Sequence, residues 1–329
     1  MGTGSKPDNT SYWMTYGVGY VGGSGSVRED LLDLITNIDP WDTPFFSAAP
    51  KSTAKSITHE WLVDALAATS TAGAYEGADF SADALTNRSR LSNMTQIFRK
   101  DILVSDTLRA VDTVGISDEY QYQVMKGMRE VARNIESAIF SGAAQITGGT
   151  ATARGMKSLG NFLAATSNCI SSTVIATADG CLISTALVNY MMEQCYTNGG
   201  NPDTLWVSPG VKADFSKAAL ASQFVRNLAA TDKKLTMNVD VYESDFGLLA
   251  IVPDRWIPQS TSGAATAVSA SGYSFYITER SKNRIAFLRP IRHVPLAKGG
   301  DATRGFIVGE LTLECLHPSA HIRCTGIIT

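Results

Sequence analysis

Hydrophobic residues between Asp118 and Ser141 recur at spacings of three and four, which is the period of one helix face. The apolar or aromatic positions on this face are Tyr120, Val124, Met128, Val131, Ile135, Ala138 and Ile139. Ser117 can cap the start, and Gly142 can adopt the left-handed conformation that ends many helices. The pattern predicts a helix over 118–141, about 36 Å long at roughly 1.5 Å per residue.

A period of two, typical of a strand, replaces the helical period between Ala54 and Ala65. A second candidate strand runs from Arg88 to Lys100, and the segment 67–86 between them is mostly Ala, Thr, Ser, Gly and Asp. Because neither strand has a continuous apolar face, the pair is predicted to be a projecting hairpin that needs a partner surface. The predicted second strand carries basic residues and the connecting segment carries acidic ones: Arg88, Arg90, Arg99 and Lys100 against Glu76, Asp79 and Asp83.

Residues 1–50 lack a steady period and are predicted to form an extended arm. A glycine-rich start, Gly17–Gly25, precedes one short helical pattern, Leu31–Ile38, which Pro40 ends. Beside Pro40 and Pro44 the arm carries the aromatic residues Trp41, Phe45 and Phe46, where no local core is evident. Burial in the core of the same domain and docking onto a neighbouring subunit are both open for them.

After Ile170 the pattern alternates between helices and strands in the α/β manner. Helices are predicted over Ser184–Thr197 and Val211–Leu220, with a strand over Thr204–Val207 between them. Further strand candidates are Thr236–Tyr242, Gly247–Val252, Tyr273–Thr278 and Ile285–Leu288. Together they predict a separate lobe over 166–285.

The C-terminal stretch Phe306–Leu316 alternates apolar with polar residues, the polar ones being Glu310, Thr312 and Glu314. A second short pattern, Ile322–Ile328, follows a turn at Pro318. We expect these two stretches to pair with each other as a long antiparallel hairpin.

The composition narrows the class of protein. Of 329 residues, 44% are hydrophobic and 18% charged, which is enough to bury a core. The formal net charge of -3 provides no basic field for nucleic acid, which argues against sequence-specific DNA binding. There is no run of about 18 apolar residues, and Met1–Pro7 lacks the pattern of a secretory signal. We therefore expect a protein made in the cytoplasm, with no membrane partner.

One glycine motif has the spacing of a nucleotide-binding loop. In such loops the glycines, here in Gly17–Gly22, let a pyrophosphate approach the N-terminus of a helix. The following helical pattern opens with Glu29 and Asp30, whose charges would repel a phosphate. A flexible arm is the simpler interpretation.

The histidines and the five cysteines do not define a site either. Four of these residues have the composition of a zinc set: Cys315, His317, His321 and Cys324. Their spacing matches no finger or ribbon, and the odd number of cysteines indicates reduced thiols. His59 and His293 stand alone, without the nucleophile and base of a catalytic centre. We expect no metal, no cofactor and no catalysis; the rival hypothesis, an α/β enzyme with its cleft in 166–285, lacks a catalytic set.

The order of predicted elements, with an arm, a projecting hairpin, a long helix, an α/β lobe and returning strands, resembles the Hong Kong 97 type of major capsid protein in tailed bacteriophages. Two strings strengthen the likeness: Asp33–Phe45 (DLITNIDPWDTPF) and Gly127–Glu136 (GMREVARNIE) are similar to one branch of those proteins. Ser281–Arg284 and His317–Pro318 are similar to the same branch, so the resemblance covers nearly the whole chain.

The resemblance implies an α+β fold of the Hong Kong 97 type in four parts. These are an N-terminal arm, 1–50; an extended β-hairpin loop, 51–104; a peripheral domain, 105–165 and 286–329, with the spine helix 118–141; and an α/β axial domain, 166–285. Axial lobes in that family meet at the centres of pentamers and hexamers, whereas the arm and extended loop lie over adjacent subunits.

The resemblance also implies a structural function: self-assembly as pentamers and hexamers into an icosahedral head around double-stranded DNA. The protein would be located in the virion after synthesis in the host cytoplasm. Its further partners would be portal, scaffolding and decoration proteins. An encapsulin-like compartment shell is the alternative with the same fold, and we expect no covalent crosslink between subunits. The residues expected to contact neighbouring subunits are Trp41, Phe45, Phe46, Trp61, Glu76, Asp79, Arg88, Arg90 and Arg99.

Overall fold

The computed structural model describes residues 39–327 except 68, 70, 72, 74, 78, 80–86, 112–114, 165–168, 172–182, 222–238 and 261–271. The predicted short helix Leu31–Ile38 and the glycine motif of the arm lie outside the described residues. In the part of the chain that is described, no helix is long and apolar enough to cross a membrane.

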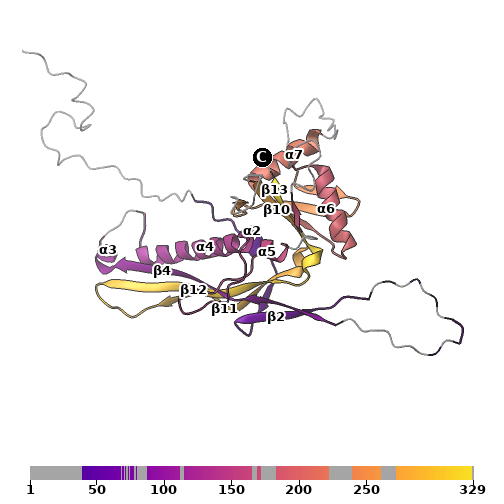
Figure 1. Ribbon diagram of the computed structural model, residues 1–329. Coiled ribbons are helices and arrows are strands. Elements are labelled where there is room, and N and C mark those ends of the chain that lie inside the picture. Colours follow the sequence, from indigo (N-terminus) through magenta and orange to yellow (C-terminus); the bar gives the residue numbers. More distant parts are fainter. Residues whose placement is uncertain are drawn as a thin grey trace, which may run out of the picture.

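A four-stranded sheet forms the elongated part of the molecule (Figure 1). Its strands are β1 (Lys51–Thr53), β11 (Asn283–Pro295), β12 (Ala302–Cys315) and β4 (Gln96–Ser105), in that order. β1 runs parallel to β11, and the other pairs are antiparallel. The prediction Ile285–Leu288 covered only part of β11, because Arg289, Pro290 and Arg292 interrupt its apolar pattern.

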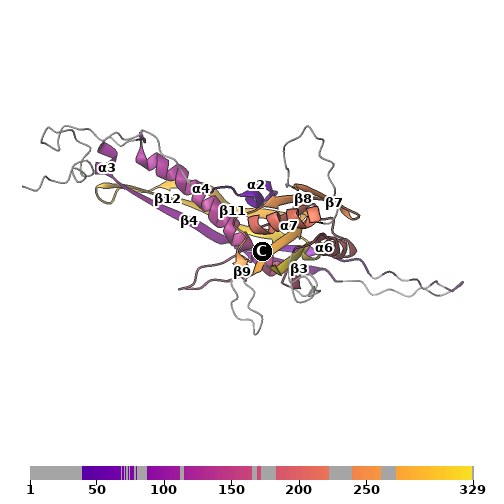
Figure 2. The same ribbon diagram turned by 90° about the horizontal axis from the view of Figure 1, so that it is seen from above.

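The long helix α4 (Glu119–Phe140) lies along β4 and β12, as Figure 2 shows from above. Its N-cap is Asp118 and not Ser117, since the Asp118 carboxylate accepts the Tyr120 N–H at 3.0 Å. An acidic cap also matches the positive end of the helix dipole. Gly142, at a φ of 74°, follows the last turn as predicted.

A two-stranded hairpin, β2 (Thr58–Val63) with β3 (Ser89–Met94), projects from the end of this sheet (Figure 1). The predicted second strand, Arg88–Lys100, is therefore two strands. The chain leaves the hairpin at the fully buried Thr95 and enters β4, which pairs with β12.

The second lobe is built on another sheet, with the strand order β5 (Cys169–Ser171), β13 (Ile322–Ile327), β10 (Gly272–Thr278), β6 (Thr204–Val207), β8 (Gly247–Pro253) and β7 (Val241–Ser244). β9 (Gln259–Ser260) pairs with β10 beside this path. Helices α6 (Thr185–Thr197) and α7 (Pro209–Ala221) supply side chains to the core on one face of the sheet. The remaining short helices are α2 (Pro44–Ala48), α3 (Asp106–Ala110), α5 (Leu159–Phe162), η2 (Arg280–Lys282) and η3 (Pro318–Ala320).

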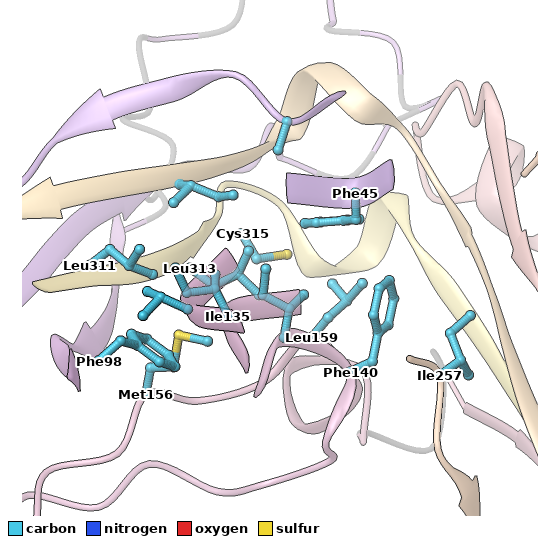
Figure 3. Close-up of a cluster of buried hydrophobic side chains, with 14 of the residues drawn as sticks. Phe45, Phe98, Ile135, Phe140, Met156, Leu159, Ile257, Leu311, Leu313 and Cys315 are labelled. Carbon is cyan, nitrogen blue, oxygen red and sulfur yellow. The ribbon is translucent and has the colours of Figure 1, made fainter. Parts of the chain in front are cut away.

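The two faces of the second sheet belong to two different hydrophobic cores. On β6, Leu205 and Val207 pack against α6 and α7, whereas Trp206 points to the opposite side. On β10, Phe275 lies in the same core as Leu205 and Val207, and Tyr276 lies in the same core as Trp206. The core on the Trp206 side, drawn in part in Figure 3, also contains side chains of α2, α4 and β12, so it joins the two lobes.

The predicted hairpin between Phe306–Leu316 and Ile322–Ile328 is wrong. β12 has β11 on one edge, and on the other edge β4 pairs along Ala302–Leu311 and the Asn93 amide bonds to the Leu313 carbonyl, so no edge is left free for a further strand. After η3 the chain instead enters the second sheet, where β13 lies between β10 and β5. The chain therefore crosses between the two sheets at η2 and at η3, in addition to its longer connection from β4 through α4 and α5 to β5.

Candidate assembly surfaces

The base of the arm, residues 39–49, is fixed by Phe45. This side chain is only 2% exposed, and its ring meets Phe140 of α4 and Trp206 of β6 edge-on, with centroids 5.3 and 5.2 Å away. Phe46 is partly buried against Phe287 of β11. Phe45 is therefore a core residue of its own chain and not the expected anchor on a neighbouring subunit.

Trp41, by contrast, is 56% exposed. The Arg129 guanidinium of α4 lies 4.8 Å from the centre of its ring, and a shallow cavity between arm and helix continues past Lys126 and Arg133. Of the aromatic residues at 41, 45 and 46, Trp41 keeps the largest free surface, so its predicted contact with a neighbouring subunit stays a prediction that the geometry allows.

A buried carboxylate on α4 holds the start of α2. Glu136 accepts the backbone N–H groups of Phe45 and Phe46, each at 2.7 Å. Burial, with the neighbouring carboxyl group of Asp254, raises the pKa of Glu136 to about 9. Beside this pair, the Trp256 indole donates to the Asp42 carbonyl at 2.9 Å. Glu136 was not predicted as a functional residue, although its position next to Ile135 on a buried helix face was a signal.

The base of the hairpin rests on the polar positions of β12. Glu310, almost fully buried, accepts hydrogen bonds at 2.8 Å from the Thr95 hydroxyl, the Arg154 guanidinium and the Arg289 guanidinium. Glu314, also buried, accepts the Ser52 hydroxyl at 2.8 Å. The alternation along β12 therefore does not mark a solvent face, because both of its faces are covered.

Asn93 of β3 completes this attachment from the hairpin side. Its amide donates to the carbonyls of Leu313 at 2.7 Å and Lys157 at 3.1 Å, and its oxygen accepts the Lys157 N–H at 2.7 Å. Trp61 on β2 is likewise buried, with Phe162 of α5 beside its ring. Trp61 thus packs inside its own chain, which is not the contact between subunits that we expected.

The outer part of the hairpin is different. Glu76 and Asp79 are exposed. On the hairpin, Arg88 forms an ion pair with Asp64 and Arg90 with Glu60, whereas Arg99 pairs with Asp101 on β4. Two large apolar side chains beyond β2, Leu66 and Tyr75, are 98% and 89% exposed. Apolar groups on a projecting element are typical of a protein interface, and the sequence analysis did not name these two.

The two cysteines of the possible zinc set lie in different sheets, and the two histidines flank η3. Cys315 ends β12, whereas Cys324 lies on β13 in the other core. His321 is buried, and its Nδ1 accepts the Glu279 N–H at 3.1 Å. Burial lowers the pKa of His321 to about 3, which keeps the ring neutral. Among the residues that the structure describes, no three His, Cys, Asp or Glu side chains are grouped to hold a metal ion.

A long helix on a four-stranded sheet, a projecting hairpin and an α/β lobe define a capsid subunit of the Hong Kong 97 type, as the resemblance predicted. A chain of the cyanophage A-1(L) capsid superposes with a TM-score of 0.68 at 13% identity, over 92% of this chain and 98% of that one. The protein belongs to the SU10 major capsid protein family, whose model matches residues 9–327.

Two further proteins are similar. The major capsid protein of Escherichia phage Phieco32 is 34% identical over 112 residues, which is 34% of this chain; the chain spans about a third of that relative (32%). A chain of the holo-SrpI encapsulin complex from Synechococcus elongatus has a TM-score of 0.56 at 8% identity, over 87% of this chain and 88% of that one. At such identity the encapsulin likeness shows the fold alone. The predicted fold class and family are confirmed.

Proposed function

We propose that this chain assembles with copies of itself, as pentamers and hexamers, into the icosahedral head of a phage. The single observation that supports it most is the hairpin: its base is fixed by buried polar contacts, while Leu66 and Tyr75 at its outer part are almost fully exposed. Because its base is rigid, the hairpin holds these exposed apolar side chains in a defined position, as contact with a protein partner requires. Membership of the SU10 major capsid protein family supports another copy of the chain as that partner.

The proposed parts follow the predicted ones, with one change. The arm is 1–50, the extended loop 51–104, the peripheral domain 105–165 with 286 onward, and the axial domain 166–285. Since β13 is a strand of the second sheet, we assign 322–327 to the axial domain. Many small contacts per subunit sum over a closed lattice, so each one can be weak.

The genome would be double-stranded DNA, enclosed without sequence-specific contacts, and the formal net charge of -3 supports such a wall. The chain would have a structural and not a catalytic function, would need no cofactor, and would be located in the virion after synthesis in the host cytoplasm. Portal, scaffolding and decoration proteins are the further partners that a head of this family would use.

An encapsulin-like shell is the second candidate, favoured by the similarity in fold to the SrpI complex. The contents of purified particles separate the two functions. Nuclease-protected DNA supports the phage head, whereas packaged protein without DNA supports the compartment.

The hairpin contact is tested by the double substitution Leu66→Ser and Tyr75→Ser. Both side chains lie in solvent, so the circular dichroism and melting temperature of the subunit should not change, while particles should disappear from sedimentation profiles. The control Leu103→Ser removes a leucine that is 68% exposed on β4, away from the hairpin, and should leave particles intact. Particles of normal yield from the double variant would contradict the proposed contact.

A further inference from the structure

Two carboxyl groups lie buried where three parts of the chain meet. Glu136 belongs to α4 and Asp254 follows β8 in the second lobe; both are at most 1% exposed. Through Phe45 and Phe46, Glu136 holds the base of the arm. The pair therefore joins arm, spine helix and second lobe at one point.

The hydrogen bonds around this pair indicate a bound proton. Both Glu136 oxygens accept backbone N–H groups, and Asp254 Oδ1 accepts the Trp256 N–H at 2.8 Å. Asp254 Oδ2 is buried and has no donor among the described residues, and the neighbouring Asp254 carboxyl group raises the pKa of Glu136. Two ionised carboxylates have no hydrogen to share, so a bond between them requires a proton on one of them.

Among the described residues, no cation forms an ion pair with either carboxyl group to replace that proton. The guanidinium groups of Arg129 and Arg133 on α4 lie over the rings of Trp41 and Trp256, and the Lys51 ammonium lies over Phe46. The other charged groups on these elements are Asp39 and Asp42 in the arm, Glu119, Lys126 and Glu130 on α4, and Arg255 beside Asp254.

We propose that one proton, shared by Glu136 and Asp254, keeps the base of the arm docked on α4, and that docking weakens as the pH rises. This inference concerns contacts within one chain and does not rest on the proposed shell function. When the proton leaves to solvent, two like charges face each other in a buried site, and separation of the arm lets water solvate both.

The direction in which docking of the arm changes with pH follows from proton linkage. Burial raises the pKa of both carboxyl groups, that of Glu136 from 4.5 to about 9, whereas in the released state water restores ordinary values. The docked state then binds one proton more than the released state between these limits. Docking is strongest in acid and falls about tenfold per pH unit up to the docked pKa.

Hydrogen exchange of the intact protein, read by mass spectrometry on peptides covering residues 43–50, measures this equilibrium. After correction for the intrinsic exchange rate, the opening constant should rise about a hundredfold from pH 6 to pH 8. In Glu136→Gln the side-chain oxygen still accepts one N–H and the amide donates to Asp254 without titrating, so the rise should vanish.

Asp254→Asn is the second variant, since its amide can donate to an ionised Glu136 that keeps both backbone contacts; it too should show no rise. Asp245→Asn, an exposed carboxyl on the turn after β7, is the matched control and should behave as the natural protein does. A constant opening of the natural protein over this range would overturn the proposal, and so would an undiminished rise in both pair variants.

Discussion

Phe45→Ala measures how firmly the arm belongs to the core of its own chain. The side chain is 2% exposed and fills the space between Phe140 and Trp206, which are held by a helix and a sheet. Those walls cannot easily collapse into the gap, so the substitution should cost the upper part of the usual range for a buried aromatic residue, about 3–5 kcal/mol.

Urea unfolding of the dissociated subunit, followed by far-ultraviolet circular dichroism, gives the change in the free energy of unfolding. Trp41→Ala is the matched control, because it removes an aromatic residue that is 56% exposed and contacts Arg129 only through its ring face. That contact contributes at most about 1 kcal/mol. A loss below about 1 kcal/mol for Phe45→Ala, or equal losses for both variants, would refute the assignment of Phe45 to the core.

Two substitutions test the contacts of β12. Glu310→Ala leaves Arg154 and Thr95 without their buried acceptor and should cost about 2–3 kcal/mol in urea unfolding, with the half-exposed Arg289 partly compensated by water. Glu310→Gln removes the charge but keeps an acceptor and should lose less; equal losses would contradict a stabilising contribution from the neutral acceptor. Gly127→Leu would place a Cβ 2.8 Å from Ile307 Cδ1, so overpacking should lower stability by about 1–3 kcal/mol and reduce the melting temperature. An unchanged melting temperature would mean that α4 moves away from the sheet freely.

Local patterns predicted the elements that depend on local contacts. The helix α4 matches the predicted range to within one residue at each end, because its buried positions follow a regular period. The strand Thr204–Val207 matches as well. The cap shifted from Ser117 to Asp118 because both side chains can accept a backbone N–H and only the geometry selects one.

Contacts between distant segments could not be read from the same patterns. Alternation along a strand does not say what covers its polar side, and on β12 the hairpin base and Arg154 cover Glu310. β13 has a strand pattern that fits any open edge, and only the topology shows that β12 has none. In the sequence Glu136 looks like any charged position on a helix, and only the folded structure shows that the arm covers it.

Electron microscopy of the purified protein, combined with sedimentation analysis, tests the central claim most directly. We expect closed shells, or rings of five and six subunits, since the exposed hairpin and Trp41 are the proposed contacts with neighbouring copies. A well-folded monomer that stays monomeric at high concentration would contradict the claim that this chain carries its own lattice contacts.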